Sequence, residues 1–163
     1  MAIIAVEKVK GSGESPPPGN KLETLADRVR RRAYEISQNH GGGREFDDWV
    51  EAERDLFFAP ESELVEKDGK YEIRVAAPGL KAAETNVTAL PDAVIVSAES
   101  SHKPEENKED VHFCEFGTRT LFRRLDLPTP INVDKVTANL DDGMLRIIAQ
   151  KSENARHVES AAA

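Results

Sequence analysis

The sequence predicts a mainly β protein, a β-sandwich that carries a helix-turn-helix arm on its N-terminal side. Two observations predict this fold. Before Pro60, apolar residues recur at steps of three and four, as they do on amphipathic helices. After Pro60, apolar and polar residues alternate in short runs separated by turn residues, as in a sandwich. We expect a flexible segment over residues 1–20, a helical hairpin arm over 21–59, the sandwich over 60–151 and a disordered tail over 152–163.

Composition and charge narrow the classes of function. The 163 residues carry a formal net charge of −8, whereas the binding of nucleic acid needs a concentrated basic face. The basic cluster of Arg28, Arg30, Arg31 and Arg32 lies on a predicted helix that is rich in acids, so we interpret it as a solvated face. We therefore expect no nucleic acid among the partners.

The cysteine count and the apolar segments predict the cellular setting. Cys114 is the single cysteine, so an internal disulfide is impossible and a reducing compartment is the natural setting. The segment from Met1 to Val6 is apolar but short and has no basic stretch before it, so it does not resemble a signal peptide. No stretch has the apolar length that a membrane span needs. We expect a cytoplasmic protein without membrane partners.

The arm is predicted as two short helices. The apolar stripe of the first consists of Leu22, Leu25, Val29, Ala33 and Ile36. The glycine run at 41–43 supplies the positive φ angles with which helices often end. Asp48 and Glu51 resemble a capping box, which places the start of the second helix near Asp47 or Asp48. Its apolar residues, which should share one side, are Phe46, Trp49, Val50, Leu56 and Phe57. Two short helices cannot bury both faces alone, so the hairpin must pack on the main domain or on another chain.

The sandwich begins with a half-buried strand in which Tyr71, Ile73 and Val75 alternate with more polar residues, and the turn at Pro78-Gly79 follows it. Further strands are predicted over 86–90, 93–97, 111–116, 120–127, 136–140 and 144–149. Asp141-Asp142-Gly143 lies between the last two and is a strong hairpin signal, because Asp-Gly tolerates the required dihedral angles. Residues 99–110 (ESSHKPEENKED) contain no apolar side chain and should form an exposed loop.

The order of several motifs after Pro60 resembles a known family. Residues 138–145 (ANLDDGML) are similar to the signature A-x-x-x-n-G-x-L. Residues 127–136 (LPTPINVDKV) are similar to L-P-x-x-(x)-V-D-x-x-x-V, and 75–79 (VAAPG) to a hydrophobic-x-x-P-G pattern. Each motif is weak alone, but their order across about residues 60–151 resembles the small heat-shock proteins, the Hsp20 or α-crystallin family. The resemblance implies an immunoglobulin-like β-sandwich, the α-crystallin domain, with Ala138, Gly143 and Leu145 as the signature residues of the closing hairpin.

The resemblance also implies a homodimer built by strand exchange. His112 and Glu115 match the H-x-x-E pair of plant and bacterial members, in which the preceding loop carries its strand across to the first strand of a partner subunit. The residues implied in the exchange are Val111, His112, Phe113, Cys114, Glu115, Phe116 and Arg123. The receiving edge would be Glu63 to Glu66. Such pairing is reasonable, because a strand on a polar loop cannot satisfy its own backbone groups.

Three features depart from the family pattern. Phe116 stands where an arginine often follows the H-x-x-E glutamate, and Arg119 stands at a position that is commonly glycine. The tail over 152–163 lacks the I-x-I or I-x-V motif with which family members plug a groove on a neighbouring sandwich, since Val158 stands alone. Assembly beyond the dimer must then come from the arm or be absent, and the groove between the 86–90 strand and the closing hairpin should be unfilled.

The arm has a resemblance of its own. Residues 32–35 (RAYE), the glycine run and residues 48–53 (DWVEAE) are similar to a short bacterial helical module of unknown function. This likeness names no activity, but it predicts a folded hairpin.

No arrangement of residues in the sequence predicts an enzyme. His112 and Cys114 would share one face of a strand, but as a nucleophilic pair they lack an orienting third group and an oxyanion turn. As metal ligands they supply two of the three or four that a zinc site needs. We expect no catalytic residue, no metal and no cofactor, and we place both residues at the dimer seam. Sensitivity of Cys114 to oxidation is a minor role that Cys114→Ser would test.

The expected function depends on apolar surface. The resemblance implies an ATP-independent holding chaperone that binds unfolding or aggregation-prone proteins and has enough charge to keep the complexes dissolved. Candidates for client contact are Trp49, Phe57 and Phe58, of which Phe58 is preferred because Trp49 and Leu56 also fit a hairpin core. The groove beside the 86–90 strand is a further candidate. The alternative function is a p23-like binding adaptor or co-chaperone that docks one specific protein through the hairpin.

Overall fold

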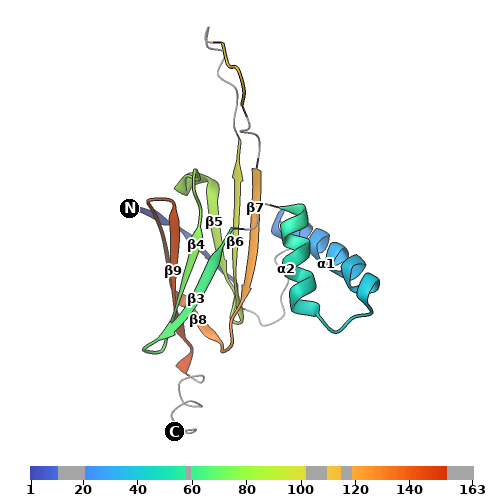
Figure 1. Ribbon diagram of the computed structural model, residues 1–163. Coiled ribbons are helices and arrows are strands. Elements are labelled where there is room, and N and C mark those ends of the chain that lie inside the picture. Colours follow the sequence, from blue (N-terminus) through green and yellow to red (C-terminus); the bar gives the residue numbers. More distant parts are fainter. Residues whose placement is uncertain (11–20, 58–59, 102–109, 115–118, 154–163) are drawn as a thin grey trace.

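Two facing β-sheets form the body of the protein, and a helical hairpin lies against one of them (Figure 1). The computed structural model describes residues 1–10, 21–57, 60–101, 110–114 and 119–153. The two sheets and the two N-terminal helices confirm the predicted fold class. Of the tail that was predicted to be disordered, residues 154–163 lie outside the described residues.

The first sheet has the strand order β1-β8-β9-β4-β3. Its strands are β1 (Ala2–Ile4), β8 (Ile131–Asp141), β9 (Met144–Lys151), β4 (Lys70–Ala76) and β3 (Ser62–Lys67). Every neighbouring pair is antiparallel. The predicted strand around Ile73 and the predicted last hairpin are therefore confirmed, and β8 begins five residues earlier than predicted.

The second sheet has the order β2-β5-β6-β7. Its strands are β2 (Val6–Lys8), β5 (Thr85–Ala89), β6 (Ala93–Ser100) and β7 (Arg119–Asp126). β2 pairs parallel with β5, and the other pairs are antiparallel. A short 3₁₀ helix, η1 (Ala82–Glu84), precedes β5.

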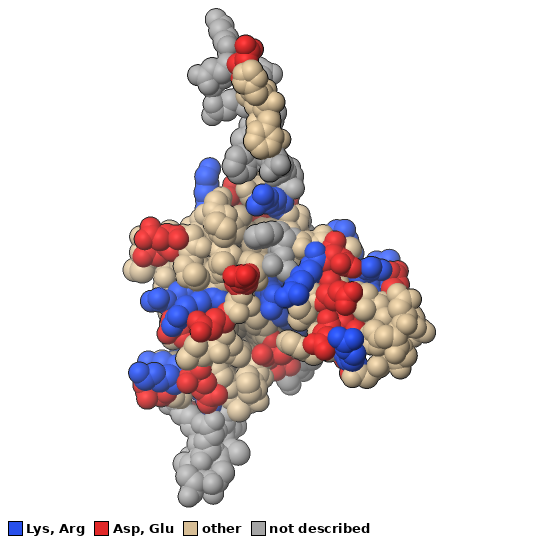
Figure 2. Space-filling view, viewed as in Figure 1, with Lys and Arg blue, Asp and Glu red and all other residues tan. Residues whose placement is uncertain are grey.

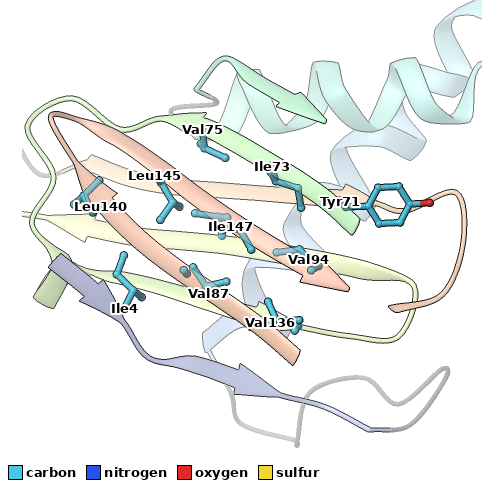
Figure 3. Close-up of a cluster of buried hydrophobic side chains, with 14 of the residues drawn as sticks. Ile4, Tyr71, Ile73, Val75, Val87, Val94, Val136, Leu140, Leu145 and Ile147 are labelled. Atoms are coloured by element: carbon cyan, nitrogen blue, oxygen red, sulfur yellow. The ribbon is translucent and has the colours of Figure 1, made fainter. Parts of the chain in front are cut away.

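The core lies between the two sheets and consists of the residues that face inward from the strands of both sheets (Figure 3). Tyr71, Ile73 and Val75 of β4 are fully buried, as their period-two spacing predicts. The Tyr71 hydroxyl also shares a hydrogen bond of 2.6 Å with Thr129 Oγ1. This bond satisfies the polar end of an otherwise apolar core residue.

The hairpin between β8 and β9 turns through two residues with positive φ, Asp142 at 47° and Gly143 at 73°. The Gly143 carbonyl accepts a hydrogen bond of 2.7 Å from the N–H of Ala77, which ties this turn to the end of β4. The other two signature residues, Ala138 and Leu145, are buried in the core. The φ of 73° at position 143 favours glycine, which adopts such angles without the steric cost of a Cβ.

The first residues of the chain are not the flexible segment that we predicted over 1–20. Residues 2–9, which we call the N-terminal strap, form β1 on the edge of β8 and then β2 on the edge of β5. The strap continues to Val9, whose N–H donates to the Ala89 carbonyl at 3.0 Å. The expectation that the groove between β5 and the closing hairpin is unfilled is wrong, because the strap occupies it. Residues 11–20 lie outside the described residues.

The arm consists of α1 (Lys21–His40) and α2 (Glu45–Leu56). As predicted, α1 ends at the glycine run, where Gly41, Gly42 and Gly43 have φ near 84° and the N–H groups of the first two donate to the Ser37 carbonyl. The predicted capping box is wrong. The N-cap of α2 is Arg44, which makes no side-chain cap bond, and the Asp48 carboxylate instead contacts His40 Nε2 at 2.6 Å.

Candidate functional site

The arm covers the outer face of the second sheet (Figure 1). The contact is a second apolar cluster, distinct from the core between the sheets. From the arm it contains Leu25, Val29, Ile36, Ala52 and Phe57, and from the sheet Leu90, Ala93, Ile95 and Phe122. The rings of Phe57 and Phe122 meet with their centroids 5.8 Å apart. The hairpin therefore packs on its own sandwich, one of the two arrangements left open by the sequence.

β6 is buried on both faces because of this arrangement. Val94 and Val96 face the core between the sheets, whereas Ala93 and Ile95 face the arm. This is the signal that sequence reasoning missed: residues 93–96 (AVIV) form a continuous apolar run, and such runs are typical of strands covered on both sides. In a sandwich strand with one solvated face, apolar and polar residues would alternate instead.

One buried polar side chain lies in the contact between the arm and the second sheet, which we call the seam. Glu53 of α2 is fully buried, and its Oε1 accepts hydrogen bonds from the Trp49 indole N–H at 2.7 Å and from the backbone N–H of Arg124 at 3.0 Å. Arg124 lies on β7, an edge strand. Glu53 therefore satisfies a backbone donor on the open side of β7, as edge strands require. Where the sandwich meets the arm, Figure 2 shows basic side chains bordering acidic ones.

Burial raises the pKa of the Glu53 carboxyl above its usual range. The hydrogen bonds from Arg124 and Trp49 and the charge of Arg123 act in the opposite direction but do not outweigh the loss of water. A buried carboxylate is costly unless its charge is well compensated. The seam therefore combines apolar packing with an electrostatic penalty.

The predicted client-contact residues do not form one exposed patch. Phe57 is buried against Phe122, and Trp49 is half-buried at the edge of the same cluster. Phe58 lies outside the described residues. The prediction that Phe46 lies on the apolar side of its helix is wrong, because 68% of the surface of this residue is exposed. The apolar surface of the arm is thus mostly covered while the arm is docked.

The receiving edge predicted at Glu63 to Glu66 lies in β3, which pairs with β4 alone among the described residues. The N–H of Ala76 donates to the Glu61 carbonyl, and hydrogen-bonded pairs alternate along an antiparallel ladder. In this register the N–H groups of Glu63 and Val65 face β4, whereas that of Leu64 points away from the sheet. β3 therefore offers outward backbone groups to a further strand.

The segment predicted to cross to a partner projects beyond the ends of β6 and β7 (Figures 1 and 2). Residues 110–114 form no strand within this single chain. Val111 and Phe113 are 71% and 75% exposed, and His112 and Cys114 are exposed as well. Glu115 and Phe116 lie outside the described residues. Two large apolar side chains thus stand in water on a projecting segment.

Arg123, also predicted at the dimer seam, lies in this chain at the seam with the arm. Its guanidinium is mostly buried, 3.8 Å from Glu53 and 3.5 Å from the Pro60 carbonyl. Among the described residues, no three His, Cys, Asp or Glu side chains are grouped as a metal site would need. No helix within the described ranges has the length and apolar character to cross a membrane.

The comparisons with known proteins agree with this geometry. The model of the Hsp20/alpha crystallin family matches residues 63–161. The chain belongs to this family. Small heat-shock membership supports a role as a chaperone, and the matched residues include the β3 edge, the projecting segment and the signature hairpin.

Individual relatives match less than the whole length. Small heat shock protein C2 of Rickettsia felis is 25% identical over 97 residues, which are 60% of this chain and 63% of the relative. The 18.0 kDa class I heat shock protein of Daucus carota is 35% identical over 77 residues, 47% and 48% of the two chains. This small heat-shock chain thus spans less than two thirds of either relative.

A solved structure supports the fold. Heat shock protein 16.0 from Schizosaccharomyces pombe aligns with a TM-score of 0.53 and 21% identity over 59% of this chain and 89% of that one. At this identity the likeness concerns the sandwich alone. The docked arm and the strap have to be interpreted from their own contacts.

Proposed function

We propose that this small heat-shock protein is an ATP-independent holding chaperone that binds unfolding proteins and prevents their aggregation. The observation that carries the proposal is the covered apolar face of the second sheet. Ile95 and Phe122 are buried because the arm lies over them. When the arm leaves, this face of the sheet and the apolar side of the arm both become exposed, and exposed apolar surface of this kind binds segments of other proteins.

The seam supports such a release. It contains a fully buried carboxylate, Glu53, whose Oε2 has no hydrogen-bond partner among the described residues. Buried charge that is poorly compensated weakens a contact. The sandwich core is a separate cluster and, within the part of the chain that the structure describes, contains no residue of the arm. The arm can therefore undock while the sandwich remains folded.

In this proposal the working unit is a homodimer formed by strand exchange. The exposed Val111 and Phe113 of one copy would lie along β3 of the other, where the N–H of Leu64 points outward. Backbone pairing of this kind gives affinity, and the alternate side chains give specificity. The single Cys114 suits a reducing setting such as the cytoplasm.

A charge placed in the apolar contact tests the proposal. Val29→Asp introduces a carboxylate at a fully buried position of α1 that faces the sheet, and should release the arm without altering the sheet. Tyr34→Asp introduces the same charge on the exposed side of the same helix. The measurement is light scattering of two unrelated heat-unfolded clients at increasing ratios of chaperone.

We expect wild type and Tyr34→Asp to suppress scattering alike, and Val29→Asp to do so at a several-fold lower ratio. A Val29→Asp chain weaker than wild type would contradict the released surface as the client site. Failure of both wild type and Val29→Asp on both clients at equimolar or higher ratios would exclude holding activity. Capture of one stoichiometric partner would then favour the p23-like adaptor.

A further inference from the structure

We propose that Lys151 is a positioning residue for assembly, because its buried ammonium group holds β3 in the first sheet and so keeps the outer edge of β3 ordered for a strand of a second copy. The inference rests on the homodimer proposed above, and it adds a residue that lies outside both β3 and the projecting segment. It is carried by one buried ion pair and by the weak attachment of β3.

Lys151 links three strands of the first sheet. It ends β9, its side chain is fully buried, and its Nζ contacts Oε1 of Glu66 on β3. Because β4 lies between β9 and β3, the side chain crosses β4, where Nζ lies 5.3 Å from the centre of the Tyr71 ring. The N–H of Lys151 also donates to the carbonyl of Gly69, in the turn that joins β3 to β4, at 3.0 Å. Both the backbone and the side chain of Lys151 thus reach the β3–β4 hairpin.

β3 has few other attachments to the sheet. It pairs with β4 alone among the described residues, and none of its six residues is buried. Leu64, which lies on the same face as the core residue Ile73, is 36% exposed. The ion pair between Glu63 and Arg74 is 3.1 Å long, but both side chains are exposed, and such pairs contribute little. A strand bound in this way frays more easily than the strands beside it.

The pair between Lys151 and Glu66 differs from the exposed pair because one of its charges lies in the interior. A buried ammonium group is costly unless an opposite charge compensates it, and removing the partner of a buried charge is much more costly than separating two surface charges. The ring of Tyr71 adds a favourable cation–π contact but no negative charge. Fraying of β3 at Glu66 would therefore take the carboxylate away from the buried ammonium, and this cost holds the end of β3 in place.

The position of Glu66 connects this pair with assembly. Glu66 belongs to the edge expected to receive the partner, and its N–H, like that of Leu64, points away from β4 in this register. An edge that is already ordered loses less conformational freedom when a strand binds, which raises the affinity. The Glu66 side chain is 43% exposed. A partner strand along the edge would exclude water from it, and the attraction between the two charges increases as the local dielectric constant falls.

Two measurements on the full chain test the role of Lys151. Lys151→Met keeps the length of the side chain but removes its charge, and it leaves Glu66 at a position that water reaches. Amide hydrogen exchange of Val65, whose N–H faces β4, reports how firmly β3 is held, and that of Ile147 reports the middle of the sheet. Sedimentation equilibrium over a range of concentrations gives the dissociation constant of the dimer.

We expect Lys151→Met to exchange the Val65 amide several-fold faster than wild type, to leave Ile147 unchanged, and to raise the dissociation constant several-fold. Glu66→Gln weakens the same pair from its exposed end, should shift both quantities in the same direction, and replaces Lys151→Met if that chain does not fold. The double variant should equal Lys151→Met, because Glu66 has no ammonium left to bind. Arg74→Gln, which removes the exposed ion pair to the same strand, is the matched control and should behave as wild type.

Four results would contradict the role of Lys151, and they are distinguishable. The first is an unchanged exchange rate at Val65 in both Lys151→Met and Glu66→Gln, with a wild type that forms dimers. The second is an equal increase at Val65 and Ile147, which would mean that Lys151 supports the whole sandwich. The third is faster exchange at Val65 with an unchanged dissociation constant. The fourth is a wild-type chain that stays a monomer at every concentration, which would refute the homodimer itself and the assembly role of Lys151 with it.

Discussion

The Nε atom of Arg123 lies 3.8 Å from Oε2 of Glu53, and neither atom has a hydrogen-bond partner among the described residues. Both side chains are nearly or fully buried, one on β7 and one on α2. The two charges attract each other at this distance but form no direct hydrogen bond, because a charge-assisted bond would be about 2.7–2.9 Å long. The arm is therefore held mainly by apolar packing, with a buried carboxylate that adds an electrostatic cost.

The first prediction concerns the pH dependence of docking. Because burial raises the pKa of Glu53, the docked state binds a proton more tightly than the undocked state. Glu53 then contributes stability below its ordinary pKa, and this contribution is lost as the pH rises through the raised pKa. Fluorescence of Trp49, the single tryptophan, should show a docking transition temperature that falls in wild type as the pH rises from below the ordinary pKa of a glutamate through the raised pKa of Glu53.

Glu53→Gln keeps the acceptor oxygen but removes the titration, so its transition should depend less on pH than that of wild type. Glu51→Gln, at an exposed position of the same helix, serves as the control and should behave as wild type. A wild-type slope that Glu53→Gln leaves unchanged would mean that another group senses the pH.

The second prediction separates the two apolar clusters. Phe122→Ala removes a ring packed against Phe57 and should weaken arm docking by about 3–5 kcal/mol. Ile147→Ala lies in the core between the sheets and should destabilise the sandwich by about 2–5 kcal/mol. Trp49 fluorescence follows docking and circular dichroism follows the sheets. Equal shifts of both signals in Phe122→Ala would show that arm and sandwich unfold as one unit.

The third prediction concerns the hairpin turn. Gly143 has φ of 73°, and a Cβ there would meet Pro78 Cα at 3.4 Å, an ordinary contact distance. The cost of Gly143→Ala should therefore come from φ alone, about 1–2 kcal/mol in the free energy of unfolding. Gly79→Ala, with φ of 78° and open space around it, should cost the same. A much larger loss at Gly143, measured by urea unfolding, would mean that the contact with Pro78 is repulsive.

The fourth prediction tests the β3 edge. Leu64→Pro removes an outward N–H without breaking a bond to β4, so the fold should persist while pairing with a partner strand is lost. Glu63→Pro removes an N–H that faces β4 and should lower the melting temperature instead. Light-scattering mass and thermal unfolding distinguish the two. A Leu64→Pro chain with the same mass as wild type would argue against strand addition at this edge.

The parts of the fold that the sequence predicts well are those with local signals. β4 follows from the alternation around Ile73, and the last hairpin follows from Asp142-Gly143, because each pattern is complete within a few residues. The strap was missed because strands of three residues are too short to show a period, and their stability comes from the distant β5 and β8. The contact of Glu53 with the sheet could not be predicted from the sequence either, since its partner Arg124 is 71 positions away.

The docked position of the arm, by contrast, could have been predicted from the sequence. Four apolar residues in succession at 93–96 are unusual for a sandwich strand with one solvated face, and they indicate a cover on the outer side. The start of α2 was misplaced because the capping interpretation of Asp48 ignored His40 at the end of the preceding helix. A carboxylate engaged with that imidazole is not available to cap its own helix.

The strap and Glu53 each engage backbone groups at sheet edges, and such edges are where copies of a chain could add to one another. The strap pairs with β5 and β8, and Glu53 of α2 occupies one outward N–H of β7, that of Arg124. Among the described residues, β3 is an edge strand of six residues with no strand on its outer side. A domain with one free sheet edge can pair with only one other copy. A domain with two free edges can add copies at both sides and grow into a fibril. In the proposed holding role, such a limit would keep the chaperone from becoming a template for the aggregation of the unfolding proteins that it binds.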